Sequence, residues 1–397
     1  MRDVIIIGGG PVGACAGALL ARAGLTVTLM EPSPPAPIPQ GSAPEVRVVA
    51  LSRASERTLR AAGAWAGVEG PRLCAYERMR IWHESRTVAQ ALVFDAADVG
   101  EPNLGYILEN RLLQLALLEA FAAAGGELRR GAFTGLKVTP AGVVIGTDAG
   151  ELDARLLIGA DGMDSRVRAA AGLGATHGDY HQSAIVARVA TARSHEHTAW
   201  QRFMKDGTLA FLPLADGSSS IVWSADTRRA EELMALDAAG FDAALARSAD
   251  EALGDTQLLS ERFAFPLRRL GAQRYVAERV ALLGDAAHVV HPLAGQGVNL
   301  GLLDAAALAE VVAAGHRRRE DPGALALLRA YERWRKSEVA VMAGAIEVFD
   351  RLLAHGTGPL ARLAQAGLST LNHSHELRRF FIRRALGTSG ELPRVAR

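Results

Sequence analysis

The first thirty residues carry a hydrophobic pattern that is typical of a parallel β-sheet with a crossover helix. An uninterrupted apolar run, Val4–Ile7, is followed by glycines at 8–10 and by a stretch rich in Ala and Leu at 12–23. A second run, Thr26–Met30, ends at Glu31. A strand buried on both faces needs a continuous apolar run, whereas a strand with one wet face alternates. The pattern predicts strand 3–7, helix 12–23 and strand 26–30.

Further strands and one long helix are expected before residue 162. The Pro- and Ser-rich stretch 32–44 predicts a surface loop. Periodicity then predicts a short strand and helix in 47–63, short alternating strands in 73–108, a helix at 110–124, and strands at 127–130, 134–138, 142–147 and 156–161.

The pattern changes between residues 176 and 270. Apolar and polar positions alternate at 184–190, 208–213 and 219–223, which is typical of an antiparallel sheet, and a helix is expected at 229–247. We interpret this region as a second domain. Residues 279–315 return to strand followed by helix, and 323–386 are predicted to be almost wholly helical.

Composition and charge narrow the class of protein. With 397 residues, 49% of them hydrophobic, the chain can build one large unit or two interleaved domains. The formal net charge of +1 provides no global field for nucleic acid, so we expect no nucleic-acid partner. The two cysteines, Cys15 and Cys74, offer no disulfide framework, and from the N-terminal residues we expect no signal peptide. We expect no membrane span and a cytoplasmic protein.

A dinucleotide motif follows the first strand. Gly8, Gly10 and Gly13 fit GxGxxG, with Pro11 and Val12 between the last two glycines, and Glu31 lies 18 residues beyond Gly13. The first glycine permits the tight turn, the second lets pyrophosphate approach the backbone, and the third lets helix and strand pack closely. Glu31 would accept the ribose hydroxyls and repel a 2′-phosphate, so the sequence predicts bound FAD or NAD.

The C-terminal half favours FAD. Two more strands end in acids, Asp161 and Asp285, and no second intact GxGxxG follows a strand. A flavin needs a partner for its ribityl hydroxyls, which Asp285 can supply. It also needs positive potential near its N1/C2 carbonyl, which helix-opening amides at 295–299 can supply.

Several stretches resemble one family. HPLAGQGVNLGLLDA (291–305) resembles the signature of the ubiquinone-biosynthesis hydroxylases, which are flavin monooxygenases. GDAAHVVHP (284–292), GADGMDSRVR (159–168) and GGGPVG (8–13) are similar to the GD, DG and FAD motifs of the wider aromatic-hydroxylase group. The resemblance covers about 1–315 and, more loosely, the tail.

The resemblance implies an α/β fold: a Rossmann-like FAD-binding domain, an inserted and mostly antiparallel β-sheet substrate domain, and a C-terminal helical segment. The expected division assigns 1–73, 109–175 and 271–322 to FAD binding, 74–108 and 176–270 to the substrate domain, and 323–397 to C-terminal helices.

The resemblance also implies roles for individual residues. Gly8, Gly10, Gly13 and Glu31 would hold the ADP half of FAD. Arg47 and Arg111 would border pyrophosphate and ribityl, and Asp161 would help to organise FAD and the transient NAD(P)H. Gly284 and Asp285 would bind ribityl, Pro292 would lie against the flavin, and the helix-opening amides would belong to Gly295, Gly297, Val298 and Asn299.

The implied activity is hydroxylation of a polyprenylated phenol ring in ubiquinone biosynthesis, through a flavin C4a-hydroperoxide, with O2 and NAD(P)H, of which we expect NADPH. Two alternatives remain open: a hydroxylase of a soluble aromatic compound, and a non-catalytic flavoprotein scaffold of a biosynthetic assembly.

The sequence names no catalytic acid or base and no metal site. Phe211, Leu212, Pro213 and Trp223 are candidate walls of a dry substrate pocket, or ordinary core. Tyr180, His181 and Gln182 are candidates for activating the substrate phenol, or ordinary sheet residues. His288 and His291 with Asp285 lack the further ligand that a metal set requires, so we expect no metal.

The tail segment 378–384, RRFFIRR, is basic and apolar together. It is a candidate for peripheral contact with the inner membrane, although Arg384 interrupts the apolar stripe. Association with other quinone-biosynthesis enzymes is the corresponding expectation for protein partners.

Overall fold

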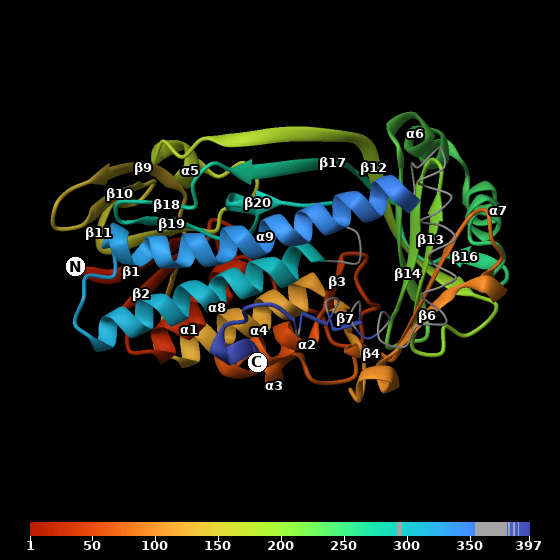
Figure 1. The fold of residues 1–397 in the computed structure, drawn as a ribbon, viewed down its shortest axis with the longest axis horizontal. Coiled ribbons are helices and arrows are strands. Elements are labelled where there is room, and N and C mark those ends of the chain that lie inside the picture. The colour runs from red at the N-terminus through yellow and green to blue at the C-terminus, as the bar shows by residue number, and fades with distance from the viewer. Residues whose placement is uncertain (292–295, 354–378, 380–381, 384–385, 388) are drawn as a thin grey trace.

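The computed structural model describes residues 1–291, 296–353, 379, 382–383, 386–387 and 389–397. The described residues form three sheets, of eight, nine and three strands. The eight-stranded and nine-stranded sheets lie towards opposite ends of the molecule, and the helices α8 and α9 run lengthwise beside them (Figure 1).

The eight-stranded sheet contains the predicted βαβ opening. Strand β1 pairs in parallel with β2 and with β11, and β11 pairs in parallel with β19. Val4, Ile5 and Ile6 are fully buried, as the continuous apolar run requires. The strands of this sheet are β1 (Arg2–Ile7), β2 (Val27–Met30), β8 (Glu127–Arg129), β9 (Phe133–Val138), β10 (Val143–Thr147), β11 (Gly150–Gly159), β18 (Val276–Ala277) and β19 (Val280–Leu282).

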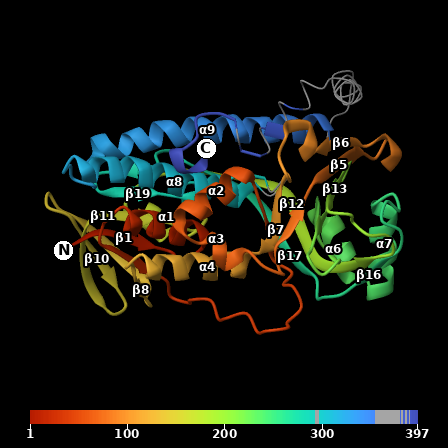
Figure 2. The same cartoon turned by 90° about the horizontal axis from the view of Figure 1, so that it is seen from below.

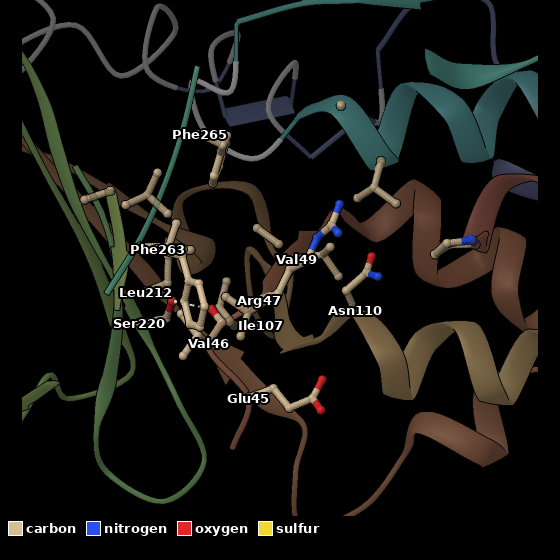
Figure 3. A pocket seen from close by; sticks show the side chains of 18 of the residues that line it. Glu45, Val46, Arg47, Val49, Ile107, Asn110, Leu212, Ser220, Phe263 and Phe265 are labelled. Atoms are coloured by element: carbon tan, nitrogen blue, oxygen red, sulfur yellow. Dashed lines mark hydrogen bonds between the residues drawn. The ribbon is translucent and has the colours of Figure 1, made fainter. Parts of the chain in front are cut away.

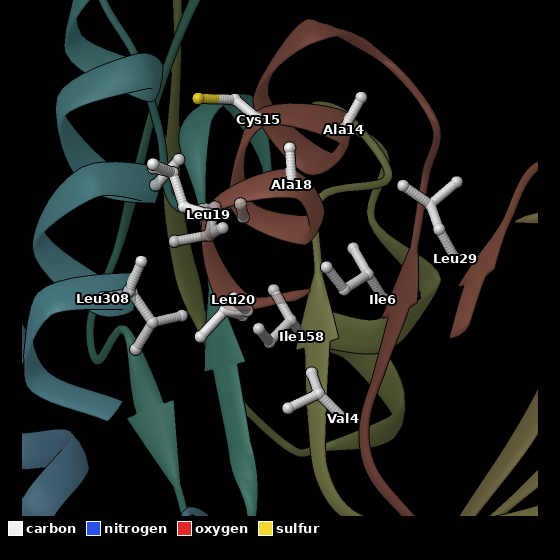
Figure 4. Close-up of a cluster of buried hydrophobic side chains, with 14 of the residues drawn as sticks. Val4, Ile6, Ala14, Cys15, Ala18, Leu19, Leu20, Leu29, Ile158 and Leu308 are labelled. Atoms are coloured by element: carbon white, nitrogen blue, oxygen red, sulfur yellow. The ribbon is translucent and has the colours of Figure 1, made fainter. Parts of the chain in front are cut away.

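Helices cover this sheet and bury its core. Helix α1 lies between α4 and α8, and α9 packs on α8 (Figure 2). Ala14, Cys15 and Ala18 of α1 belong to the same buried apolar cluster as Val4 and Ile6 of β1 (Figure 4). The helices are α1 (Pro11–Arg22), α2 (Arg53–Ala62), α3 (Trp65–Val68), α4 (Asn110–Ala123), α5 (Arg166–Ala170), α6 (Thr227–Ala235), α7 (Ala238–Ser248), α8 (Gln296–Arg317) and α9 (Leu325–Leu353).

The nine-stranded sheet is antiparallel except where β13 pairs in parallel with β5. One face carries apolar residues at every second position and packs on α6 and α7, and the other face turns towards the remainder of the protein. Its strands are β5 (Arg78–His83), β6 (Leu92–Asp95), β12 (Ala175–Thr191), β13 (Thr198–Met204), β14 (Gly207–Pro213), β15 (Ser219–Asp226), β16 (Thr256–Leu258), β17 (Phe263–Ala272) and β20 (His288–Val289).

The third sheet is small and has β7 at its centre. Strand β7 (Gly105–Glu109) pairs with both β3 (Val48–Leu51) and β4 (Cys74–Tyr76). Of the strands expected in 73–108, β5 and β6 therefore enter the nine-stranded sheet, whereas β4 and β7 do not. The expected domain division stays a prediction.

Local chemistry sets the helix boundaries. Pro11 occupies the first turn of α1, where its missing N–H costs nothing. The helix predicted at 229–247 is instead two helices, because the Asp237 side chain accepts a hydrogen bond from Gly240 N and starts α7 anew.

Helix α8 is apolar enough to be compared with a membrane span. Residues Gly297–Arg317 have the length and mean hydropathy of such a span, yet 67% of the most apolar window is buried inside the protein. It packs between α1 and α9. A core helix meets the same criterion, so the finding by itself does not assign α8 to a membrane.

Candidate active site

A cavity of about 1450 Å³ extends between the eight-stranded and nine-stranded sheets. Gly10 and Glu31 line it at the carboxyl ends of β1 and β2, and Trp200 and Phe263 line it on the nine-stranded sheet. Leu212, Ser220 and Phe263 come from that sheet, and Asn110 comes from the start of α4 (Figure 3). Single-ligand pockets usually measure about 300–1,000 Å³, so this cavity is large enough for more than one small molecule.

The three motif glycines meet different surroundings. Gly8 has φ +106°, and a Cβ on Gly13 would lie 2.0 Å from the Gly8 carbonyl oxygen, so both are required by the turn and its packing. Gly10 has an ordinary φ of −65°, and a Cβ there would meet no atom within 4 Å. The missing side chain of Gly10 therefore leaves space in the cavity rather than in the core. Pro11 and Val12, in the first turn of α1, also line the cavity.

Glu31 lies at the end of the cavity that is formed by the carboxyl ends of β1 and β2. Its carboxylate accepts hydrogen bonds from Gly9 N (2.8 Å) and Ser33 N (2.9 Å), which fix its position at the end of β2. Gln114 of α4 donates to Gly9 O (2.8 Å) and lines the cavity with Asn110. We did not predict Gln114 or Asn110. Their spacing of four residues places them on one helix face, and this signal was present in the sequence.

Arg47 and Arg111 occupy different positions. Arg47 lines the cavity, whereas Arg111 forms an ion pair with Glu45 (2.5 Å). The structure therefore places Arg47 and Glu45 on the cavity wall, whereas Arg111 is paired with Glu45 and is not among the residues that line the cavity.

Asp161 is used locally. It accepts hydrogen bonds from Ser165 Oγ (2.6 Å), Arg166 N (2.8 Å) and Val167 N (3.2 Å), and so caps α5. Its neighbours Ala160 and Gly162 line the cavity. Asp161 therefore fixes the backbone of the DG motif by these hydrogen bonds, and its neighbours rather than Asp161 itself line the cavity.

Asp285 lies on the cavity wall in the turn after β19. Removal from bulk water raises the pKa of its carboxyl, and nearby His288 and Arg47 oppose that shift. Gly284 adopts φ +54°, and its N–H donates to Asp304 Oδ2 (3.1 Å). The turn that presents Asp285 is therefore held from beneath by Asp304 of α8.

Asp304 belongs to a buried ionic cluster. It accepts from His288 Nε2 (2.5 Å) and from Arg335 Nε (2.7 Å). Burial alone would raise the pKa of Asp304, but His288 and Arg335 hold it below its ordinary value. The cluster connects α8, α9 and the turn of Asp285, and local sequence patterns do not predict it.

The start of α8 reaches the cavity through Gly297 and Val298. Asn299 turns its side chain to other elements: Oδ1 accepts from Ser52 N (2.9 Å) and Ser55 Oγ (2.6 Å), and Nδ2 donates to Ala50 O (2.8 Å). These bonds fasten the helix start to β3 and α2. Pro292 and Gly295 lie outside the described residues.

The predicted substrate walls need correction. Leu212 lines the cavity, but Phe211 and Trp223 are 2% exposed and pack against Phe241 and Leu245 of α7. Side chains alternate along a strand, so Phe211 and Pro213 cannot share the face of Leu212. The cavity face of β14 and β15 instead carries Thr208, Ala210, Leu212, Ser220, Val222 and Ser224.

Tyr180, His181 and Gln182 lie in an irregularity of β12, where the register with β17 shifts between Asp179 and Ser183. His181 has φ +56° and is exposed. Gln182 accepts from Nε2 of His291 (3.2 Å), and the Tyr180 ring lies edge-on to His291 at 4.8 Å between centroids. His291 is buried and lines the cavity. A bulge cannot be read from alternation, so this grouping depends on the tertiary structure.

These residues fit an FAD. The acid at the end of β2, the space at Gly10, the acid on the cavity wall and the glycine at the start of α8 all line this one cavity, and they suit the adenosine ribose, pyrophosphate, ribityl and flavin of the cofactor, in that order. Among the described residues, no group of three or more His, Cys, Asp or Glu is arranged to hold a metal ion.

Replacing Gly10 by Val tests this fit. The new side chain would occupy the space that pyrophosphate needs, so we expect the FAD dissociation constant to rise by roughly two orders of magnitude. The melting temperature of the cofactor-free protein should change by no more than about 2 °C, because nothing in the protein clashes. Fluorescence titration with FAD measures the first quantity and calorimetry the second.

Gly135→Val on β9 is the matched control, because a Cβ there also meets no atom within 4 Å. Unchanged FAD affinity in Gly10→Val would remove Gly10 from the cofactor site.

Comparisons with known proteins agree with this geometry. The FAD binding domain family matches residues 1–343. The chain is 36% identical to 3-demethoxyubiquinol 3-hydroxylase of Escherichia coli, over 97% of this chain and 98% of that protein. It is 35% identical to ubiquinone hydroxylase UbiL of Rhodospirillum rubrum, over 100% and 93%.

Among solved structures, p-nitrophenol 4-monooxygenase PnpA from Pseudomonas putida superposes with a TM-score of 0.77 at 18% identity, covering 97% of this chain and 98% of that chain. At that identity the likeness concerns the fold, which is the predicted α/β arrangement with a mostly antiparallel second sheet. The full-length identities establish more: the chain belongs to the family of FAD-dependent aromatic monooxygenases that includes the ubiquinone-biosynthesis hydroxylases.

Proposed function

We propose that this protein hydroxylates a polyprenylated phenol in ubiquinone biosynthesis, with NADPH as reductant. The observation that carries the proposal is the neutrality of the cavity wall on the nine-stranded sheet. The described residues that line it there include no charged side chain; they are Met79, Val186, Ala199, Trp200, Gln201, Thr208, Ala210, Leu212, Ser220, Val222, Ser224, Phe263, Ala264, Phe265 and Val289.

A neutral wall favours a substrate without a carboxylate. An ionised carboxylate in a desolvated pocket needs a cation or several hydrogen bonds, or its desolvation is not offset. Arg47 lines another part of the cavity and lies close enough to Asp285 to lower the pKa of that carboxyl. The positive charge of Arg47 is therefore already partly balanced by Asp285. A phenol with an apolar substituent fits such a wall better than a benzoate does.

Bound FAD would supply the redox chemistry, by accepting a hydride from NADPH and activating dioxygen for transfer of one oxygen atom to the ring. The protein's own task is to position the ring and exclude water. The apolar strand side chains exclude water, and the amides at the start of α8 favour negative charge on whatever lies beside them. The names of the two relatives support the pathway.

Steady-state assays test the proposal. We expect a prenylated phenol to stimulate NADPH oxidation and to yield a hydroxylated product by mass spectrometry, at least roughly tenfold more efficiently than 4-hydroxybenzoate does, since the carboxylate forfeits about 1.4 kcal/mol or more. Preference for the benzoate would support a hydroxylase of soluble aromatic compounds. Flavin reduction without any hydroxylated product would support a scaffold role.

A strain lacking the protein identifies the step. The quinone intermediate that accumulates there should lack one ring hydroxyl, and its structure names the carbon that is attacked. Normal ubiquinone in that strain would contradict the assignment to this pathway.

We further propose a cytoplasmic location with peripheral contact on the inner membrane, and association with other quinone-biosynthesis enzymes, because a polyprenylated substrate partitions into the bilayer. The tail segment 378–384 contributes less to this proposal than its sequence indicated. Ile382 is 2% exposed and packs with Ala96 and Leu104, and Arg379 donates to Asp98 O. Only part of that segment is described. Cell fractionation tests the location.

A further inference from the structure

The cavity face of the nine-stranded sheet carries a continuous transverse row of side chains. Consecutive register partners pair Gln201 with Ala210, Ala210 with Val222, Val222 with Val186, and Val186 with Phe263. All five residues line the cavity, and they come from β13, β14, β15, β12 and β17 in that order. The row therefore crosses five neighbouring strands on one face.

The side chains on either side of this row are mostly small. Thr208 pairs with Ser224 on one side of the row, and Leu212 pairs with Ser220 on the other. These residues also line the cavity, and most of them are small. Strands lie about 4.8 Å apart, so four spacings give a shallow channel of roughly 19 Å across the sheet.

The two ends of the row differ. At the β13 end, Gln201 pairs with Ile81 of β5 and Ile81 pairs with Leu92 of β6; these side chains are 7% and 3% exposed, so this end is buried. At the β17 end, Phe263 is 51% exposed and Phe265 is 45% exposed, and both line the cavity. This end opens to the surface.

Strand β17 is a free sheet edge at that point. Within the described part of the chain, β20 pairs with β17 only at Leu270 and Gly271, which leaves the outer side of Phe263–Pro266 without a strand partner. Two half-exposed phenylalanines on one strand that also line a cavity mark a binding surface rather than scattered surface apolar residues.

We infer that the apolar substituent of the substrate lies along the row Gln201–Ala210–Val222–Val186–Phe263 and leaves the protein over β17, between Phe263 and Phe265. The inference rests on the proposed function, since a substrate without a long substituent has no need of the route. It assigns Val222 and Val186 to recognition of the substituent, and Phe263 and Phe265 to its exit.

Photo-crosslinking on the FAD-loaded protein tests the route without requiring turnover. The probe is a prenylated phenol with a diazirine at the far end of its chain. We expect label on the tryptic peptide 263–268, FAFPLR, suppressed by the unlabelled compound, and no label there from a phenol that carries the diazirine directly on the ring. Label from the long probe confined to other peptides would overturn the inference.

Substitutions supply a second measurement. In Val222→Trp, the indole would obstruct the middle of the row, so we expect KM for a long-chain prenylated phenol to rise at least tenfold, while kcat/KM for the chainless phenol falls by a clearly smaller factor. The double variant Phe263→Asp/Phe265→Asp should show the same selectivity.

Val138→Asp is the control, because Val138 is a 44% exposed apolar residue on β9, away from the cavity. FAD content and the melting temperature show whether each variant is folded. Equal losses on both substrates, or none on either, would contradict the route while leaving the proposed hydroxylase intact. If the wild type acts on the chainless phenol alone, the proposed function fails, and the inference fails with it.

Discussion

Replacing Asp304 by Asn is expected to lower the free energy of unfolding by about 3–5 kcal/mol, the usual cost of breaking a buried ion pair by removing one partner. Asp304 is fully buried, and its partner Arg335 is 1% exposed. The amide keeps the shape of the carboxylate but leaves the Arg335 guanidinium in the core without its counter-charge. Urea denaturation with and without FAD measures the loss.

The same carboxylate predicts a pH dependence. Its pKa in the folded protein lies below the ordinary value of 3.8, so ionised Asp304 stabilises the fold at pH values above 3.8. That stabilisation is lost as the pH falls from there through the folded pKa. Stability of the wild type should therefore fall more steeply in acid than that of Asp304→Asn.

Glu232→Gln is the matched control, since it removes a carboxylate from exposed pairs with Arg228 and Arg229 on α6. Exposed pairs contribute about 0–1 kcal/mol, so this variant should unfold almost as the wild type does. If Asp304→Asn were equally mild, the cluster would not hold the turn of Asp285.

Replacing Asn299 by Leu is expected to cost about 3 kcal/mol, because the buried Ser52 N–H and Ala50 C=O would each lose a hydrogen-bond partner. Leu has a similar volume, so the loss reports hydrogen bonds rather than a cavity. The start of α8 would also lose its attachment to β3 and α2. FAD affinity should therefore fall together with stability, which titration and thermal denaturation measure.

Asn299→Asp separates the two contributions. Aspartate still accepts from Ser52 N and Ser55 Oγ but cannot donate to Ala50 O, so it should retain part of both the stability and the FAD affinity. Equal FAD affinity in all three proteins would show that the side chain of Asn299 does not position the helix start.

Much of the cofactor half could be predicted from the sequence, because local rules decide it. A continuous apolar run, a glycine turn and an Ala-rich stretch suffice for a βαβ unit, and β1, α1 and β2 form where the pattern indicates. The tight spaces around Gly8 and Gly13 and the open space at Gly10 agree with the local roles expected of three motif glycines.

The substrate half shows where periodicity falls short. Alternation correctly predicted β14 and β15, yet it does not say which of their two faces turns to the cavity. Phe211 and Trp223 looked like pocket walls because they are large and apolar, but those properties also suit the core beneath α6 and α7. The smaller residues Ala210 and Val222 line the cavity instead.

The sequence patterns also did not predict contacts between segments that are separated along the chain. Asp304 meets His288 and Arg335 across 16 and 31 residues, and Asn299 meets Ser52 across 247. The sequence by itself determined the order of strands and helices, the nucleotide motif and the family, since each depends on neighbouring residues and their spacing. The tertiary structure alone decided which sheet face lines the cavity and which buried side chains hold the turn of Asp285 and the start of α8. Those features depend on how separate elements pack, and their burial and partners exist only once the chain has folded.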